Sequence, residues 1–499
     1  MMLQPVVHTG QGTVRGVLDD GGVAAFKGIP YAAAPFGANR FRPPRPAEPW
    51  SGVRDASGYG PTAPKAPYPA PYDRLIPEVD IPGGDCLNLN VWTPDPGGRL
   101  PVMVWLHGGA FANGSGSVPG YDGSRFARDG VVCVTLNYRL GADGFLYLGE
   151  GDPANLGLLD QIAALRWVRD NIPAFGGDPD RVTVAGESAG AMSIGALLAM
   201  QSAAGLFGRA ILHSGAAHHT LGPGTGRLIG RQLADRLGVA PARRALAAVP
   251  LDRLTQAQQQ LRADIAARPD PALWGEATRN LMPFEPVVDG VTLPRPPIDA
   301  IADGAAAGVD LLIGTNSDEF RLFLVPNGVI DHIPEPLLAQ TAAGYGLDAE
   351  NAIRTYREQR PGATPGDLLA AIATDWFYRI PAVRLAEAQI RHRPDGVFLY
   401  EFAWRPPTFA GRLGACHAVD LPFAFDNLHD TAFAPLIGTE PPQRLADALH
   451  AAWVSFIATG DPGWPAYDEK RRATLRFDVR PDLEHDPRPE ERTLWEGRR

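Results

Sequence analysis

Short apolar runs separated by Gly, Asn or His constrain the fold of this chain most strongly. They are rich in Val, Leu and Ile and lie at 102–106, 131–136, 182–185, 210–212 and 309–313. Such runs are typical of strands that are buried on both faces of a parallel sheet. Between two of them, apolar residues recur at three- and four-residue steps from Leu158 to Ile172, which predicts an amphipathic helix. The alternation predicts an α/β fold, with a mainly parallel central sheet flanked by helices.

The remaining segments fit around that sheet. The first hundred residues are rich in Pro and Gly, which predicts an N-terminal arm of loops and short edge strands. Two longer helical stretches, at about 227–267 and 334–391, interrupt the alternation, and 397–404 returns to strand. These helical insertions either cap a site or simply cover the core.

Composition limits the classes of partner. The 499 residues include 46 Lys and Arg against 56 Asp and Glu, a net charge of −10 that offers nucleic acid and anionic membranes little attraction. No run approaches the ~18 apolar residues of a membrane span. The three cysteines have neither zinc-site spacing nor a disulfide pattern. The N-terminus lacks a basic start followed by an apolar run, so we expect a cytoplasmic protein.

The strongest local motif is Gly186-Glu187-Ser188-Ala189-Gly190, directly after the 182–185 run and before a helix-like stretch. A tight strand-to-helix turn needs small flanking residues and holds its central serine out of the sheet, at the positive end of the following helix. This pattern favours Ser188 as a nucleophile. The alternative is an ordinary glycine-rich turn.

A second motif, His107-Gly108-Gly109-Ala110-Phe111, follows the 102–106 run. Its small residues let backbone N–H groups point into a cleft, so Gly109 and Ala110, with Ala189, are candidate donors to an oxyanion. A phosphate-binding loop is a weak alternative, because Pro119 stands where such a loop needs its last glycine.

A serine nucleophile also needs a base and an acid that orients the base. When the serine lies in a Gly-x-Ser-x-Gly turn, the carboxylate follows it in the sequence and the histidine comes last. Asp318 and Glu319 both follow the 309–313 run, and spacing does not choose between them. His417 is on a loop beyond 397–404. Its rivals as the base are His429, His450 and His485.

Several blocks together resemble the type B carboxylesterases, a family that includes bacterial para-nitrobenzyl esterases, lipases and cholinesterases. Besides the two motifs, they lie at 26–32, 85–92, 137–141, 155–161, 175–179, 213–215, 314–319, 415–425 and 460–462. The resemblance implies an α/β-hydrolase fold in a bacterial member. It also implies that Ser188 is the nucleophile, Glu319 the acid and His417 the base, with Gly109, Ala110 and Ala189 as oxyanion donors.

The resemblance implies a serine carboxylesterase for small esters, with no metal or cofactor. Aromatic residues near the motifs indicate an apolar pocket for esters with short to medium acyl or aromatic groups, and oligomers of aromatic polyesters are further candidate substrates. Alternatives are an amidase or carbamate hydrolase with the same triad, and a catalytically silent binding protein. Because the triad spans more than two hundred residues, we expect one large domain over 1–499. Oligomeric state is not predicted.

Other positions carry weaker expectations. Aromatic residues near the motifs are candidates for the substrate pocket: Phe111, Phe284, Phe320 and Phe323. Phe320 stands where many relatives have Gly. Ser214 and Asp420 match polar positions near the family's active site, where they either support it by hydrogen bonds or are structural. Cys86 lacks the cysteine partner of many secreted members and is expected to be a free thiol.

Overall fold

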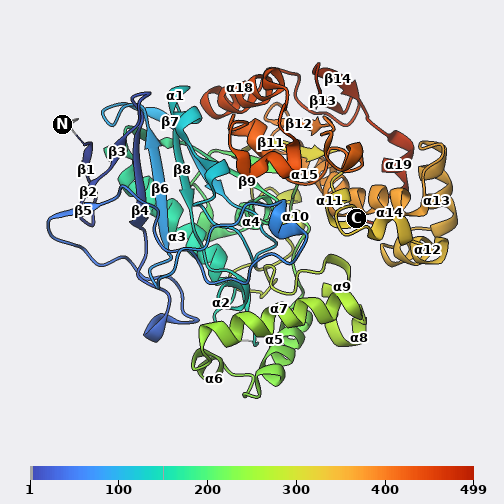
Figure 1. Cartoon of the computed structure of the whole chain (residues 1–499), viewed down its shortest axis with the longest axis horizontal. Helices are drawn as coiled ribbons and strands as arrows, with labels where there is room; N and C mark the ends of the chain where they lie inside the picture. Colours follow the sequence, from blue (N-terminus) through green and yellow to red (C-terminus); the bar gives the residue numbers. More distant parts are fainter. Residues whose placement is uncertain (1–3, 150) are drawn as a thin grey trace.

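The computed structural model describes residues 4–149 and 151–499. Their main feature is an 11-stranded sheet in the order β14-β13-β12-β11-β10-β9-β7-β8-β6-β4-β3, which crosses the molecule in Figure 1. Its strands are β3 (Val17–Leu18), β4 (Ala24–Pro30), β6 (Asn88–Thr93), β7 (Leu100–Leu106), β8 (Val132–Leu136), β9 (Gly177–Glu187), β10 (Arg209–His213), β11 (Asp310–Asn316), β12 (Val397–Phe402), β13 (Ala473–Phe477) and β14 (Asp482–His485).

The middle of the sheet is parallel. From β8 to β13 every neighbouring pair runs in the same direction, whereas pairs at both edges are antiparallel. In the central register Leu106 of β7 is opposite Leu136 of β8 on one side and Gly186 of β9 on the other. The apolar runs thus coincide with β7 to β11, and the predicted mainly parallel sheet is confirmed.

The N-terminal segment contributes more to this sheet than the arm that we expected. Strands β1 (Val6–His8), β2 (Thr13–Arg15) and β5 (Val53–Asp55) form a separate small sheet, but β4 and β6 join the main one. Strand β6 is buried along its whole length between β8 and β4. Its polar residues are satisfied inside the sheet: Asn90 accepts from the Gly28 N–H at 3.0 Å and donates to the Thr135 hydroxyl at 2.9 Å.

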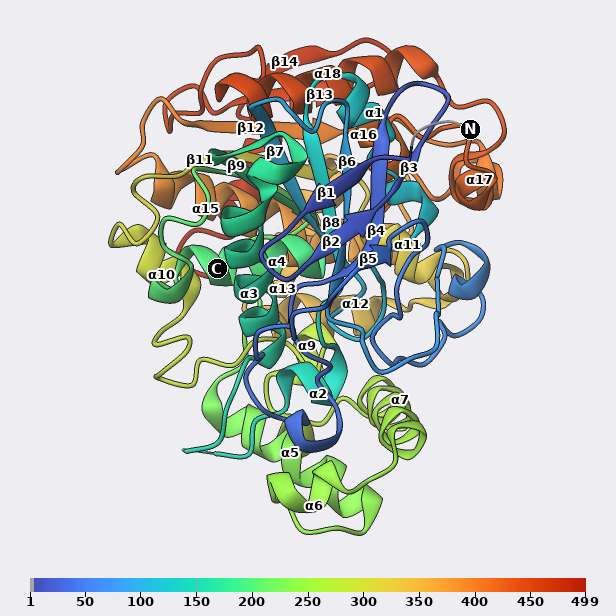
Figure 2. The same cartoon turned by 90° about the vertical axis from the view of Figure 1, so that its left-hand side faces the viewer.

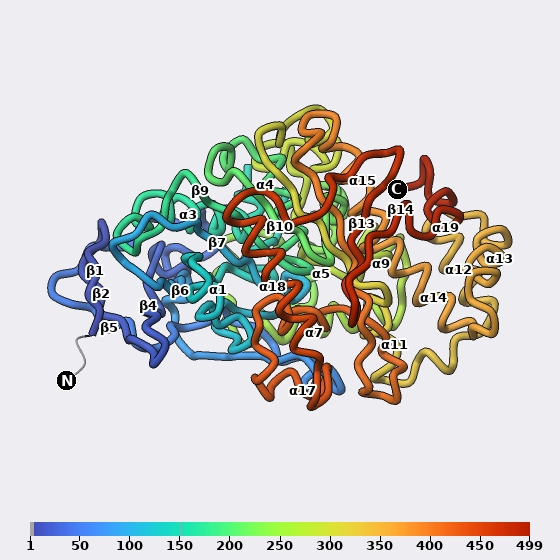
Figure 3. The backbone as a smooth tube through the Cα atoms, turned by 90° about the horizontal axis from the view of Figure 1, so that it is seen from above, coloured from blue at the N-terminus to red at the C-terminus, as the bar shows by residue number. Residues whose placement is uncertain are grey.

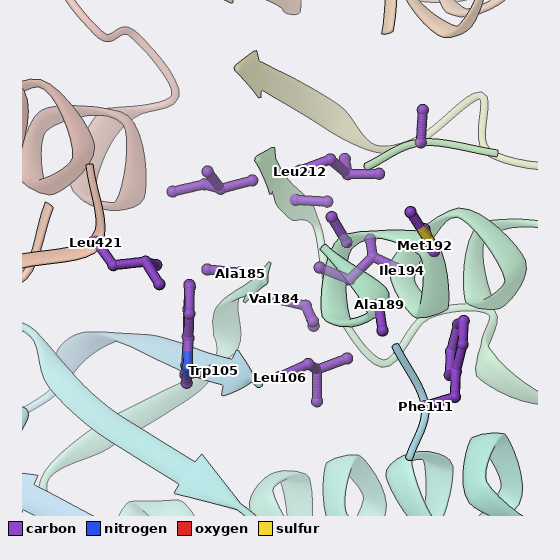
Figure 4. Close-up of a cluster of buried hydrophobic side chains, with 14 of the residues drawn as sticks. Trp105, Leu106, Phe111, Val184, Ala185, Ala189, Met192, Ile194, Leu212 and Leu421 are labelled. Atoms are coloured by element: carbon purple, nitrogen blue, oxygen red, sulfur yellow. The ribbon is translucent and has the colours of Figure 1, made fainter. Parts of the chain in front are cut away.

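Helices cover both faces of the sheet. In Figure 3, α3 (Leu156–Asn171), α4 (Ala189–Leu198) and α15 (Ile380–Gln389) lie on one side, and α1 (Ser124–Arg128) and α18 (Gln443–Thr459) on the other. Figure 4 shows the core where α4 meets the strands, with Ile194 of the helix near Val184 of β9 and Leu212 of β10. The shorter helices are α2 (Gly141–Phe145), α10 (Pro297–Ala302), α11 (Arg321–Leu324), α16 (Leu421–Ala424), α17 (Ala434–Ile437) and α19 (Pro489–Leu494).

Helices occupy both stretches predicted as insertions. The first contains α5 (Pro223–Leu237), α6 (Arg243–Ala247) and α7 (Leu251–Ala267), followed by α8 (Pro271–Trp274) and α9 (Ala277–Asn280). The second contains α12 (Glu335–Gly344), α13 (Ala349–Glu358) and α14 (Pro365–Thr374), and a π-helical turn, Asp375–Arg379, joins α14 to α15. Figures 1 and 2 show the first group beneath the sheet, and Figure 1 shows α12, α13 and α14 at its far end from the N-terminus.

The sheet directs several motifs to one edge. Strands β7, β9, β10 and β11 end just before the motif segments that begin at His107, Ser188, Ser214 and Ser317. In a parallel sheet, the carboxyl ends of the strands face the same way, and ligand sites form there. All three cysteines are buried free thiols, as expected for Cys86. Among residues 4–149 and 151–499 no helix is long and apolar enough to cross a membrane.

Candidate active site

Ser188 sits between β9 and α4 in a strained conformation. Its φ of 54° and ψ of −124° place it in a region that non-glycine residues rarely adopt. The Ser188 N–H donates to the carbonyl of His213 at 3.0 Å, which ties the turn to β10. The side chain is 9% exposed. This is the predicted strand-to-helix turn, and it presents the hydroxyl at the N-terminus of a buried ten-residue helix.

The two glycines of the motif permit this turn. A Cβ on Gly190 would overlap the carbonyl oxygen of Leu106, the last residue of β7. A Cβ on Gly186 would lie 2.7 Å from the carbonyl carbon of Gly190. Because backbone surrounds both positions, no side-chain movement could relieve these overlaps.

His417 is oriented by Glu319. Its Nδ1 lies 2.7 Å from Oε2 of Glu319, and its backbone N–H donates to the Glu319 carbonyl at 3.1 Å. The other carboxylate oxygen, Oε1, accepts from the N–H of Asn316 at 2.8 Å. The Glu319 side chain is fully buried, so its geometry is fixed on both sides. The rings of Tyr378 and Phe323 flank the imidazole, with centroids 4.8 and 5.6 Å away.

The rival candidates lie elsewhere. Asp318 accepts a hydrogen bond from the N–H of Ala415 at 3.2 Å. It therefore contacts the backbone of the loop that carries His417 and does not contact the imidazole. Nε2 of His450, in α18, lies 3.0 Å from Asp129, His429 is exposed, and His485 is in the edge strand β14. Of the histidine candidates, only His417 lines a cavity with Ser188.

A second carboxylate, which the sequence did not single out, also faces His417. Oε1 of Glu187 lies 3.1 Å from Nε2 of the imidazole. Burial alone would lower the pKa of His417, but Glu187 and Glu319 outweigh it and raise that pKa to about 9. Burial raises the pKa of Glu187 to about 7, against the opposing effect of His417. The only feature of the sequence that could have indicated a role for Glu187 is its position directly before Ser188.

Three backbone N–H groups near Ser188 have no acceptor in the described part of the chain. Gly109 and Ala110 have positive φ values of 111° and 53°, so the chain leaves the extended conformation of β7 here. Neither backbone N–H donates to an acceptor among the residues that the structure describes. The N–H of Ala189, the first residue of α4, is one of the unpaired donors that any helix start leaves. All three residues are those predicted as oxyanion donors. Gly109 and Ala110 line the same cavity as Ser188.

That cavity has a volume of about 780 Å³ and is lined mainly by apolar side chains. Phe320 and Phe323, two of the candidate pocket residues, form part of its wall. Phe111 and Phe284 do not line it, which corrects the prediction for these two residues. The turn at Phe111, with φ of 57°, directs its ring against Phe145, and Phe284 is 2% exposed in the core.

Ser188 and His417 both line this cavity, but no hydrogen bond joins their side chains among the residues described. In ligand-free active sites such bonds are often long and shorten only when substrate binds. Asp420 lies behind the site, where its Oδ1 accepts from Asn316 at 3.0 Å and its Oδ2 is 2.8 Å from Nε2 of His213. Ser214 is buried next to His213, and its hydroxyl has no partner in the described chain.

Comparison with known proteins adds the decisive observation. The model of the Carboxylesterase family matches residues 3–495. The chain belongs to the carboxylesterase family. It is 43% identical to the para-nitrobenzyl esterase of Bacillus subtilis, with 98% of each chain covered. It is 38% identical to the phenmedipham hydrolase of Pseudarthrobacter oxydans, with 95% of each covered.

Solved structures agree with this membership. A crystal structure of a carboxylesterase from Geobacillus stearothermophilus superimposes with a TM-score of 0.86 at 39% identity, over 98% of this chain and 99% of that one. The α/β-hydrolase fold implied by the family resemblance is thereby confirmed. The protein is a carboxylic ester hydrolase that acts on small ester substrates.

Proposed function

We propose that this carboxylesterase uses Ser188 as nucleophile, His417 as base and Glu319 as orienting acid. The observation that carries the proposal is the contact of 2.7 Å between Nδ1 of His417 and Oε2 of Glu319, on the wall of the cavity that also holds Ser188. A carboxylate at Nδ1 fixes the tautomer in which Nε2 is free to accept a proton.

The reaction then follows from these positions. His417 takes the Ser188 proton as Oγ attacks the ester carbonyl, and Glu319 stabilises the imidazolium that forms. The N–H groups of Gly109, Ala110 and Ala189 receive the negative charge on the carbonyl oxygen. The alcohol leaves with a proton from His417, and water repeats the sequence on the acyl-enzyme. The original Ser188 proton leaves with the alcohol and a proton from water restores the hydroxyl, so the cycle consumes only the ester and one water molecule.

The apolar cavity supports short to medium acyl or aromatic esters as substrates, including oligomers of aromatic polyesters. Its volume of about 780 Å³ suits a drug-sized ligand. A chain-length series of 4-nitrophenyl esters measures the acyl pocket directly, and we expect an optimum at short or medium length. Matched amides and carbamates test the alternative leaving groups, and we expect the ester to be hydrolysed fastest.

The test of the catalytic assignment is Ser188→Ala. We expect turnover of 4-nitrophenyl butyrate to be lost while the circular dichroism spectrum and melting temperature remain those of the wild type. A near-normal rate would disprove the nucleophile assignment.

We further propose that residues 1–499 act as one domain. This is supported by the site residues, which come from β9, β11 and the loop after β12 of the same sheet.

We also propose a cytoplasmic location. The three buried free thiols support a reducing compartment of this kind.

A further inference from the structure

One cation lies on the wall of the active-site cavity without a carboxylate partner. Arg262 belongs to α7 in the first helical insertion, next to the buried Leu261 that anchors the helix. Its side chain is half-buried and lines the cavity that also holds Ser188 and His417. The guanidinium therefore faces the space that a bound substrate would fill.

The guanidinium makes one hydrogen bond within the described chain, from Nη1 to Oδ1 of Asn113 at 3.3 Å. No Asp or Glu oxygen among the described residues lies within 4.0 Å of it. Lys65, which also lines the cavity, differs because its Nζ lies 3.7 Å from Glu78 and 4.0 Å from Asp80.

A partly buried and unpaired charge is costly, because it gives up hydration without gaining an anion. Burial accordingly lowers the pKa of Arg262 below its ordinary value. An anion that arrives with a ligand would remove that cost. A planar guanidinium with free donors suits a carboxylate best, since the two groups can form paired, charge-assisted hydrogen bonds.

Arg262 is also connected to the catalytic turn. Asn113, which receives its hydrogen bond, donates its own N–H to the carbonyl of Gly109 at 2.8 Å. Gly109 is one of the oxyanion donors. One residue thus links the cation to the turn that would hold the reacting carbonyl, and Arg262 and Gly109 line the same cavity.

We propose that Arg262 binds a carboxylate of the substrate, so that the enzyme favours esters that carry a second, ionised carboxyl group. Half-esters of dicarboxylic acids and acyl esters of phenolic acids belong to this class. The apolar walls hold the hydrocarbon part while Arg262 holds the charged end. This inference rests on the proposed function of the same cavity.

Two matched substrate pairs test the proposal. The first is the 4-nitrophenyl half-ester of adipic acid against the 4-nitrophenyl ester of adipic monoamide, which places the charge on the acyl side. The second is 4-butyryloxybenzoate against 4-butyryloxybenzamide, which places it on the alcohol side. Within each pair the amide removes the charge and keeps the shape, so the ratio of kcat/KM values isolates the carboxylate.

The ratio is measured in the wild type, Arg262→Gln, Arg262→Lys and Arg253→Gln. Arg253 is an exposed arginine on the same helix, so its substitution removes an equal charge away from the cavity. We expect Arg262→Gln to lower the charged-to-neutral ratio about 10- to 100-fold in at least one pair, mainly through KM. Arg262→Lys should retain much of the ratio, and Arg253→Gln all of it.

The pair that responds identifies the side of the ester that reaches Arg262. An unchanged ratio in Arg262→Gln for both pairs would overturn the inference, as would an equal fall in Arg253→Gln. In either case the proposed function would stand if the neutral substrates are still hydrolysed and Ser188→Ala abolishes that hydrolysis. Turnover of the neutral substrates by Ser188→Ala would instead disprove the proposed function.

Discussion

Nε2 of His417 lies 3.1 Å from Oε1 of Glu187, the residue that immediately precedes Ser188. With Glu319 at Nδ1, the imidazole therefore lies between two carboxylates. Both carboxylates stabilise its protonated form and raise the pKa of His417 to about 9, against the opposing effect of burial. A base must be neutral to accept a proton, which makes this contact a determinant of the pH at which the enzyme works.

The first prediction concerns the pH profile. The raised pKa of His417, about 9, means that kcat/KM should fall as the pH drops below that value. Glu187→Gln removes one of the two charges, so the acid limb should move about 1 to 3 pH units lower. Initial rates with a 4-nitrophenyl ester from pH 4 to 10 locate the acid limb in the wild type and in Glu187→Gln. A limb that stays in place in Glu187→Gln, or a wild-type rate that is flat down to about pH 4, contradicts this account.

The second prediction separates the two neighbouring carboxylates. Glu319→Gln should lower kcat by several orders of magnitude, because the imidazole loses its orienting and stabilising partner. Asp318→Asn should reduce it far less, because Asp318 contacts the backbone of Ala415 and not His417. Steady-state kinetics of the two variants under identical conditions give the ranking, and the reverse order would show that the wrong acid was chosen.

The third prediction concerns the ion pair behind the site. Asp420 and His213 are fully buried, 2.8 Å apart. Burial opposes both charges, but each group stabilises the other, so the pKa of Asp420 lies below its ordinary value and that of His213 above it. Asp420→Asn leaves His213 without its anion and should lower the free energy of unfolding by about 3 kcal/mol.

The pH dependence of that loss follows from the same shifts. The contribution of Asp420 is lost as pH falls through its lowered pKa, and that of His213 as pH rises through its raised pKa. Urea unfolding should therefore show the largest difference from the wild type between these two limits. Asp252→Asn, on an exposed position of α7, is the control. Equal stability of Asp420→Asn and the wild type across this range would count against a stabilising pair.

The fourth prediction tests the tight turn itself. Gly190→Ala places a methyl group on the carbonyl of Leu106 and should cost about 1–3 kcal/mol, with loss of activity as the turn shifts. Gly208→Ala is the control, because the added Cβ would meet nothing within 4 Å. Thermal melts and ester assays of both variants are the measurement. A Gly190→Ala enzyme with wild-type melting and rate would show that close packing here is not required.

Sequence patterns predicted the strands because their evidence is local. Each of the strands β7 to β11 contains an apolar run that can be recognised without knowledge of its partners. The strand-to-helix turn at Ser188 is predicted by the glycines on either side of the serine and by the strand and helix patterns that flank them. The position of β6 inside the sheet was harder to predict, because its asparagines are typical of an exposed edge strand. The residues that satisfy these asparagines, such as Thr135, come from distant parts of the chain.

Side-chain direction explains the remaining differences. Asp318 and Glu319 are adjacent, so spacing could not choose between them, and the choice came from family resemblance. Phe111 was expected in the pocket because it adjoins the motif, but its positive φ turns the ring into the core. Arg262 stands among polar residues of an amphipathic helix and looks like part of a solvated face. Only the packing of α7 over the cavity distinguishes it.

The central claim is that Ser188 is the catalytic nucleophile, and trapping tests it most directly. A 4-nitrophenyl alkylphosphonate imitates the tetrahedral intermediate and attaches to an activated serine. We expect one equivalent of 4-nitrophenol per enzyme, complete loss of esterase activity, and a mass increase confined to the peptide that contains Ser188. Modification of another residue, or esterase activity that persists after one equivalent has reacted at Ser188, would contradict the account.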